Sequence, residues 1–286
     1  MTFSIAAWDG DVSPPEWGVA VASKFLAVGA AVPWVRAGAG AVATQALANL
    51  AYGPEGLDLL AAGTDAAGVV AQLTAADEGR DDRQLGVVDA SGRAATFTGS
   101  SCFDWAGGVA EDGFACQGNI LTGPEVVDAM AGAFRATSGE LAVRLLAALK
   151  AGDDAGGDRR GRQSAALYVA REGGGYGGGV DRAVDLRVDD HLTPVDELAR
   201  LWRIHSLLFP RPESLEFVPI DGELAGEIRY LLSQLGYDAG SGGGDEPYDA
   251  RLKGALYEYV GTENLEERWA DDARIEKRVL EHLRSH

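Results

Sequence analysis

The sequence contains few cysteines and few basic residues, and each shortage excludes some classes of binding site or partner. Only two cysteines occur in 286 residues, Cys102 and Cys116, and their spacing matches neither a zinc ligand pair nor a disulfide framework. We expect both to be small, buried hydrophobic residues. His191 and His205 also lack a partner at metal-ligand spacing, so we expect structural roles for them and predict no metal or other cofactor.

Basic residues are outnumbered by acidic ones, 25 against 44, and the formal net charge is -19. A field of this sign repels phosphate backbones and anionic lipid headgroups. We therefore expect no nucleic-acid partner and no membrane partner. An acidic surface favours cationic or neutral substrates, although solubility is the simpler explanation for it.

Long hydrophobic runs are absent as well. No stretch reaches about eighteen consecutive apolar residues, and the first nine residues lack the basic and apolar segments of a signal peptide. We therefore expect a cytoplasmic protein. The sequence contains no G-x-x-x-x-G-K-[ST] motif, and the glycine run at 173–179 is too irregular for a nucleotide-binding loop.

What the sequence does contain is a regular alternation of strand blocks and helix pairs. This order predicts an α+β fold with two stacked sheets covered by helices, rather than a succession of βαβ units. Strands are expected at 2–8, 17–23, 32–36, 40–45, 84–89, 94–98, 114–117, 164–170 and 184–188. Helices are expected from 46 with a break at Gly53-Pro54, at 64–78 with Thr64 as the N-cap, and at 124–137, 140–151 and 194–208.

Prolines at 210, 212 and 219 indicate a linker, which divides the chain into domains at 1–209 and 220–286. Beyond this linker, 224–235 and 248–259 are amphipathic segments separated by a glycine-rich run at 240–244. The last segment, 264–286, is highly charged and predicts a solvated helix. The sequence thus indicates a small helical C-terminal domain.

Five segments occur in the order that is typical of one family: Thr2 to Ile5, Gly18 to Gly29, Gly38 to Ala46, Gln117 to Leu121 and Gly156 to Ser164. Over about residues 1–209 the chain resembles the family called domain of unknown function 1028, which is placed in the Ntn-hydrolase superfamily. The resemblance implies a four-layer αββα Ntn-hydrolase-like sandwich. The C-terminal segment is similar to the peptidoglycan-binding-like segment often attached to this family. An activity has to be argued from the residues themselves.

Thr2 is the first candidate for a nucleophile. In an N-terminal nucleophile enzyme the free α-amine of the first residue takes the proton from that residue's own hydroxyl or thiol. The α-amine titrates at about 7.7–8.0, which suits a base near neutral pH. Removal of Met1 would expose Thr2 in this way, whereas Thr2 could otherwise simply begin a strand. Ser4 and Ser23 are weaker candidates.

Two further residues are catalytic candidates. Lys24 follows the second strand, where a hairpin returns it towards Thr2, and a cation there would hold the amine neutral and stabilise developing negative charge. Asn119 could donate an amide N–H to an oxyanion. Equally, Lys24 could be a solvated turn residue, and Asn119 could be a turn residue in the left-handed region.

The remaining candidates would bind substrate. Thr44 and Gln45 end a glycine-flanked strand and could line the same cleft as Thr2 and Ser23. Arginine is concentrated at 159–162, where Arg160 and Arg162 could bind a carboxylate or phosphate. The alternative is that these arginines pair with acidic residues of the same loop, namely Asp153, Asp154 or Asp158.

These residues lead to two main hypotheses. The first is an N-terminal nucleophile amidohydrolase that acts on a small amide or peptide, with Thr2, Lys24 and Asn119 at its centre. The second is a non-catalytic protein that binds a small ligand or serves as a scaffold, because a fold does not guarantee a chemistry. The C-terminal segment suggests cell-wall glycan as a weaker third partner, and such helices also serve in homo-oligomers.

Overall fold

The computed structural model describes residues 2–242 and 247–286, and the chain forms two units, Met1–Leu201 and Trp202–His286. The first unit is built around strand β1 (Thr2–Asp9), which occupies the centre of a six-stranded sheet. The order of this sheet is β10-β9-β2-β1-β8-β7, and all of its neighbours are antiparallel. The other strands are β2 (Glu16–Ser23), β7 (Gly107–Glu111), β8 (Phe114–Asn119), β9 (Ser164–Arg171) and β10 (Arg182–Val188).

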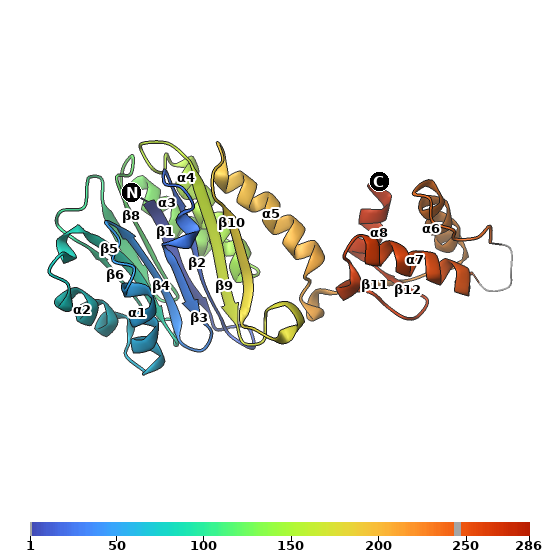
Figure 1. Cartoon of the computed structure of the whole chain (residues 1–286), viewed down its shortest axis with the longest axis horizontal. Helices are drawn as coiled ribbons and strands as arrows, with labels where there is room; N and C mark the ends of the chain where they lie inside the picture. Colours follow the sequence, from blue (N-terminus) through green and yellow to red (C-terminus); the bar gives the residue numbers. More distant parts are fainter. Residues whose placement is uncertain (1, 243–246) are drawn as a thin grey trace. The chain divides into compact units, whose positions relative to one another are not determined.

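A second, four-stranded antiparallel sheet packs against the first (Figure 1). Its order is β3-β4-β5-β6, with β3 at Pro33–Arg36, β4 at Gly40–Ala46, β5 at Arg83–Asp89 and β6 at Ala94–Thr98. Strands β1 and β8 contact β4 and β5 across the interface between the sheets. Small side chains such as Ala6, Ala41 and Ala43 fill its interior.

Helices cover the outer face of each sheet, which makes four layers. Helices α1 (Tyr52–Ala61) and α2 (Ala66–Ala76) pack on the four-stranded sheet, and α3 (Glu125–Ala136) and α4 (Leu141–Asp154) pack on the six-stranded sheet. Strands covered on both sides are apolar on both faces, as expected for buried sheets. The α+β class and the antiparallel sheets predicted from the sequence are therefore confirmed.

Alternation along β1 decides which residues reach which layer. Successive side chains of a strand point to opposite faces. Ala6 lies in the core between the sheets, whereas Phe3 packs near Gly152 and Gly157 on the helical side. Thr2 and Ser4 share the parity of Ala6, so they face the second sheet.

The second unit has its own hydrophobic core, which includes Ile228, Leu256 and Val279. Helix α5 (Pro194–Leu208) crosses from one unit to the other, and the second unit continues with α6 (Gly222–Gln234), α7 (Ala250–Thr262) and α8 (Lys277–Arg284). Strands β11 (Phe217–Pro219) and β12 (Arg274–Glu276) pair antiparallel. Short 3-10 turns lie at Val28–Ala30, Arg80–Asp82, Tyr176–Gly178, Pro212–Ser214 and Glu266–Arg268.

The second unit contains a buried ion pair. The Arg268 guanidinium lies 2.9 Å from the Glu276 carboxylate, and both side chains are almost fully buried. Arg268 also donates to the carbonyls of Ser206 and Leu207. The Glu276 carboxylate in turn caps the start of α8. Charged groups buried in this way are tolerated only when their hydrogen bonds are satisfied.

Several local predictions are wrong for physical reasons. The segment 264–286 is a 3-10 turn, a strand and a short helix rather than one solvated helix, because its apolar residues Val279, Leu280 and Leu283 are buried. The linker at 210–219 stays a prediction, and that segment contains the 3-10 turn Pro212–Ser214 and β11. Gly53-Pro54 does not break α1, since proline is tolerated in the first turn of a helix.

Three smaller differences concern caps, one strand and the cysteines. Asp65, not Thr64, caps α2, and β7 was not predicted. Cys116 is fully buried as expected, whereas Cys102 is only partly buried. Burial raises the pKa of both thiols, so neither is an activated nucleophile. Part of the glycine-rich run at 240–244 lies outside the described residues.

No helix within residues 2–242 and 247–286 combines the length and the apolar character needed to cross a membrane.

One carboxylate joins the helices of the second sheet to the start of β5. Asp77 accepts hydrogen bonds from Arg83 Nε (3.0 Å), the Tyr52 hydroxyl (3.0 Å), Asn49 Nδ2 (3.2 Å) and the Gly79 N–H (2.8 Å). The hydrogen bond from Arg83, with those from the other donors, holds the pKa of Asp77 well below its usual range. Ionised Asp77 is therefore favoured in the folded state over the unfolded state.

We expect Asp77→Asn to lower the melting temperature at neutral pH. We also expect the melting temperature of this variant to fall less than that of the native chain when the pH is lowered. The folded pKa lies below the unfolded value of about 3.9, so the stabilisation is complete above that value and disappears as pH falls towards the folded pKa. Thermal unfolding followed by circular dichroism from about pH 7 to about pH 2 tests this. Asp58→Asn, which breaks only an exposed pair with Arg36, is the control. Identical pH profiles for the two variants would contradict the assignment.

Candidate functional site

Four amide side chains lie between the two sheets near the start of β1. They are Gln45 on β4, Gln84 on β5, and Gln117 and Asn119 on β8, and each is at most 2 % exposed. We call these four residues the amide cluster. Burial of an amide is unfavourable unless its donors and acceptor are hydrogen-bonded, so the contacts within the cluster decide whether this region is stable.

The amide cluster is connected through Gln84. Its Oε1 accepts from Gln45 Nε2 and from Asn119 Nδ2, each at 2.8 Å, and its Nε2 donates to the Gly118 carbonyl at 2.7 Å. Ser4 supplies a second connection, because its hydroxyl donates to Gln45 Oε1 at 2.6 Å and accepts from Gln117 Nε2 at 2.7 Å. These bonds link the two sheets across their interface.

Glycine makes room for one member of the cluster. A Cβ added at Gly86 on β5 would lie 2.0 Å from Gln117 Oε1, so Gln117 can occupy its position only because residue 86 lacks a side chain. Within residues 2–242 and 247–286, that Oε1 has no hydrogen-bond partner, although the amide nitrogen of the same side chain donates to Ser4.

Thr2 lies at the edge of the amide cluster. It stands directly opposite Ser23 on β2 and Asn119 on β8, and its hydroxyl lies 3.1 Å from the Ser23 hydroxyl. Its carbonyl accepts from Gln45 Nε2 at 3.3 Å. The fold therefore brings together four of the candidate residues from the sequence, namely Thr2, Ser23, Gln45 and Asn119. The Thr2 side chain is only 4 % exposed.

Thr44 does not join this group. It neighbours Gln45 on β4, and consecutive side chains of a strand point to opposite faces. The Thr44 hydroxyl donates to the Asn49 carbonyl at 3.1 Å, on the side of the sheet that α1 covers. Only one of these two residues can therefore face the gap between the sheets.

Lys24 lies outside the group as well. Its side chain is exposed, and its ammonium contacts the Arg162 carbonyl at 3.4 Å. Its backbone N–H donates to the Asp158 carboxylate at 2.9 Å, which ties the end of β2 to the loop before β9. The structure thus places Lys24 one residue beyond Ser23, on the solvent side.

The two arginines of this loop are paired with acidic neighbours. Arg160 lies 2.7 Å from Asp158, and Arg162 lies 2.7 Å from Asp153. The hydrogen bond to Asp153 raises the pKa of Arg162. Pairing with Asp153 and Asp158, which the sequence left open as an alternative, is the arrangement in this structure, with Asp153 in the last turn of α4 and Asp158 in the loop.

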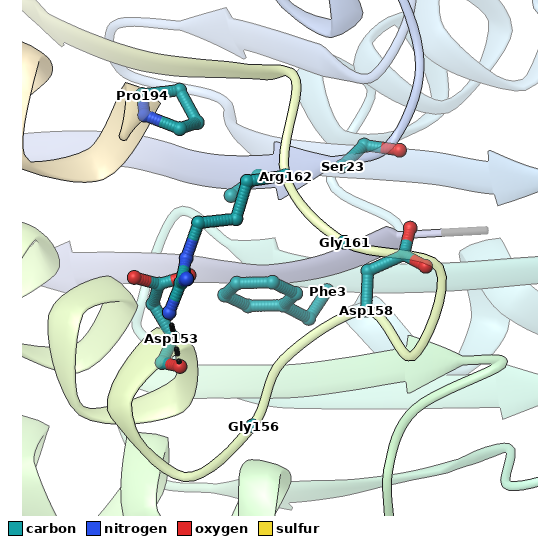
Figure 2. Close-up of a pocket in the computed structure, with 9 residues that line it drawn as sticks. Phe3, Ser23, Asp153, Gly156, Asp158, Gly161, Arg162 and Pro194 are labelled. Atoms are coloured by element: carbon teal, nitrogen blue, oxygen red, sulfur yellow. Dashed lines mark hydrogen bonds and ion pairs between the residues drawn. The ribbon is translucent and has the colours of Figure 1, made fainter. Parts of the chain in front are cut away.

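A small cavity of about 70 Å³ lies beneath these ion pairs. Figure 2 shows Arg162 reaching across it to Asp153, with Phe3 lying between Asp153 and Asp158. Its lining residues are Phe3, Ala22, Ser23, Asp153, Gly156, Asp158, Gly161, Arg162 and Pro194. A volume of this size holds about two water molecules at their liquid volume of about 30 Å³ each. Ser23 lines the cavity and also contacts Thr2.

The sequence matches the model of a family of unknown function (DUF1028) over residues 2–198. The chain belongs to this family. The solved crystal structure of a DUF1028 protein from Silicibacter pomeroyi is similar to it, with 35% sequence identity and a TM-score of 0.65. The match covers 72% of this chain and 89% of that one. No curated protein matches the chain.

A second family model matches the C-terminal part of the chain. Residues 208–283 match the model described as "Putative peptidoglycan binding domain". The match falls within the second structural unit, Trp202–His286. Both resemblances inferred from the sequence are therefore confirmed.

Two central members of the site in this DUF1028 chain, Gln84 and Gln117, were not recognised as site residues from the sequence. The available signal was a glutamine at an inward-facing position of an otherwise apolar strand, where burial requires a hydrogen-bond partner. Ser4, considered only as a weak nucleophile, is instead the hydroxyl that connects Gln45 to Gln117.

We expect Gln84→Met to lower the free energy of unfolding by at least about 2 kcal/mol. The substitution keeps the approximate shape of the side chain but leaves the donors of Gln45 and Asn119 buried without their acceptor, at about 1–3 kcal/mol each. Urea unfolding measures the change. Gln72→Met, on the exposed face of α2, is the matched control with an expected effect below about 0.5 kcal/mol. Equal effects of the two variants would show that the cluster does not stabilise the interface.

Proposed function

We propose that the DUF1028 unit is an N-terminal nucleophile amidohydrolase that acts on a small amide or peptide. The observation that carries the proposal is the position of Thr2. Its hydroxyl lies 3.1 Å from that of Ser23, and Thr2 stands directly opposite Asn119 on β8. A four-layer arrangement of helices and sheets with a threonine at the start of a central strand agrees with the Ntn-hydrolase-like sandwich that we propose for this unit.

The chemistry begins once Met1 is removed and the amino group of Thr2 is free. That amine takes the proton from the Thr2 hydroxyl while the oxygen bonds to the substrate carbonyl carbon. The C–N bond then breaks, and the leaving amine receives the proton. Water hydrolyses the resulting ester and regenerates Thr2. Ser23, hydrogen-bonded to the nucleophile, orients its hydroxyl.

In this proposal Asn119 stabilises the oxyanion. An amide nitrogen has two N–H groups, and Asn119 uses Nδ2 to donate to Gln84 Oε1 at 2.8 Å. That bond fixes the amide plane, which is what a rigid oxyanion donor requires. The second N–H of the same nitrogen is the donor in the proposal.

Charged residues around the cavity would position the substrate. Lys24 would favour the neutral form of the Thr2 amine, since a nearby cation disfavours a second positive charge. Arg160 and Arg162 would exchange Asp158 and Asp153 for a carboxylate of the substrate. Gln45 would contact the substrate amide. Thr44, on the opposite face of β4, would act only by fixing the backbone next to Gln45 through its hydrogen bond to the Asn49 carbonyl. Because Thr2 is 4 % exposed, the chain around it has to open before substrate reaches it.

The burial of Thr2 also supports the second candidate function, a non-catalytic protein that binds a small ligand or serves as a scaffold. Thr2 is hydrogen-bonded through both its hydroxyl and its carbonyl, as a purely structural residue would be. The ion pairs of Asp153 and Asp158 are likewise complete without a ligand. Reversible ligand binding by a chain that retains Met1 would favour this candidate.

The second unit suggests a separate partner, cell-wall glycan. Its support is the family match over residues 208–283 and an exposed aromatic side chain, Tyr257, which contacts Trp269 edge-on at 5.2 Å. An aromatic ring with one face in water binds apolar surfaces such as those of a sugar ring.

A β-lactone probe tests the catalytic proposal. Attack by an activated Thr2 hydroxyl opens the lactone ring by breaking its C–O bond, so the intact mass of the chain rises by the whole probe. We expect one adduct per chain, only on protein that has lost Met1, with Thr2→Ala unreactive. Thr2→Ser should keep its reactivity because its nucleophile is the same type of hydroxyl.

Thr262→Ala is the matched control for this experiment, because Thr262 is an exposed threonine at the end of α7 and should not affect labelling. Labelling of Thr2→Ala to the same extent as the native chain would remove Thr2 from the mechanism. Full labelling of a chain that retains Met1 would do the same.

A sedimentation assay with purified peptidoglycan tests the glycan partner. We expect the native chain to sediment with the polymer and Tyr257→Ala to lose at least about tenfold in affinity, through the loss of a stacking ring. Tyr230→Ala removes an equally exposed tyrosine from α6 and serves as the control. Failure of the native chain to sediment would rule out this partner.

A further inference from the structure

Three side chains of metal-ligand type converge in the second unit, in a different unit from the candidate site described above. Glu263 caps the end of α7, His282 lies on α8, and His286 lies just beyond α8. We infer that these three residues form a binding site for a transition-metal cation of the Zn²⁺ class. Neither family match assigns a metal to this chain, and the inference does not depend on the amidohydrolase proposal.

The distances between the three ligand atoms suit one ion. His282 Nε2 lies 3.2 Å from Glu263 Oε2 and 3.4 Å from His286 Nε2, and His286 Nε2 lies 4.0 Å from Glu263 Oε2. A triangle with these sides has its corners about 2.1 Å from a common point, which matches the Zn–N and Zn–O distances of about 2.0–2.2 Å. In a tetrahedral site with bonds of this length the ligand atoms lie about 3.4 Å apart, so two of the three separations already fit and the one between His286 and Glu263 has to shorten from 4.0 Å.

The spacing of the two histidines explains their convergence. Residues four apart in a helix lie on the same face one turn apart, and a helical turn ending at His286 places the two rings together. The ring centroids are 4.8 Å apart and the planes meet at 78°. Both imidazoles present Nε2 to the same point, since each of these atoms lies within 4.0 Å of Glu263 Oε2.

A buried aromatic ring forms the wall behind the site. Tyr259, which is fully buried on α7, contacts both imidazoles with ring-centroid distances of 6.4 Å. It packs in turn against Tyr237 at 5.8 Å. The histidine rings are therefore supported on their inner side, and an apolar wall of this kind limits the access of water to one side of a metal.

The donor set indicates the class of metal. Two imidazole nitrogens and one carboxylate oxygen suit Zn²⁺ and its borderline neighbours, whereas Mg²⁺ and Ca²⁺ prefer oxygen ligands alone. Three protein ligands leave a fourth tetrahedral position for water or another molecule. His286 is exposed, so this position is reached from solvent.

A bound ion would also tie α8 and the residues just after it to α7. Glu263 immediately follows that helix, and His282 and His286 belong to the last ten residues of the chain. An ion that binds only when all three ligands are together stabilises the folded unit by mass action. Zinc should therefore raise the melting temperature of the second unit, and the rise should depend on these ligands.

Isothermal titration calorimetry of the full, untagged, chelator-treated chain with Zn²⁺ tests the site. We expect one ion per chain. His282→Gln and His286→Gln should each weaken binding by more than about tenfold, because each removes one of three ligands. His191→Gln is the matched control, since it removes a histidine of the first unit and leaves the cluster intact. Its affinity for Zn²⁺ should equal that of the native chain.

Two further measurements distinguish the loss of a metal ligand from the loss of the folded structure. His286 is exposed, so His286→Gln should keep the native circular dichroism spectrum even if His282→Gln does not. Titration with Co²⁺, a coloured probe, should give a tetrahedral absorption spectrum that His286→Gln abolishes. Zn²⁺ binding that is equally tight in the native chain and in His286→Gln would overturn the inference. So would the absence of binding, which would leave the three side chains as an ion pair and a hydrogen bond only.

Discussion

The need to satisfy buried amides between two sheets governs the first unit. Gln84 accepts hydrogen bonds from a neighbouring strand of its own sheet and from the opposite sheet, so neither sheet can shift without leaving a buried donor unpaired. Apolar contacts nearby are formed by small side chains such as Ala6 and Ala43, which bring the sheets close but specify little about register. The polar contacts supply that specificity.

The same constraint determines what Thr2 can do. A threonine at the start of a central strand is held from both sides, by Ser23 and Asn119, and this rigidity suits a positioned nucleophile. It also buries the hydroxyl. A catalytic Thr2 and a purely structural Thr2 would therefore both be buried and rigidly held. The chemical state of the Thr2 amino group, free or blocked by Met1, distinguishes the two roles.

The second unit follows a different principle. Its helices pack on a hydrophobic core, and the pairing of β11 with β12 brings Glu276 to the buried Arg268. One carboxylate thus both neutralises a buried guanidinium and caps α8. This arrangement positions α8, and with it His282, beside Glu263.

The sequence by itself determined the α+β class, the hairpins and the main helices, because the period of the apolar residues and the turn residues act locally. It also indicated Thr2, Ser23, Gln45 and Asn119 as candidate site residues, from the chemistry of their side chains and their positions at strand ends. Only the tertiary structure decided that Gln45 and not Thr44 faces the second sheet, that Lys24 lies towards solvent, and that Arg160 and Arg162 are paired. The contacts of Gln84 and Gln117, and the meeting of Glu263 with the histidine pair at 282 and 286, depend on strands and helices that are separate in the chain. Local patterns carry no information on which distant side chains meet, since packing alone sets those distances.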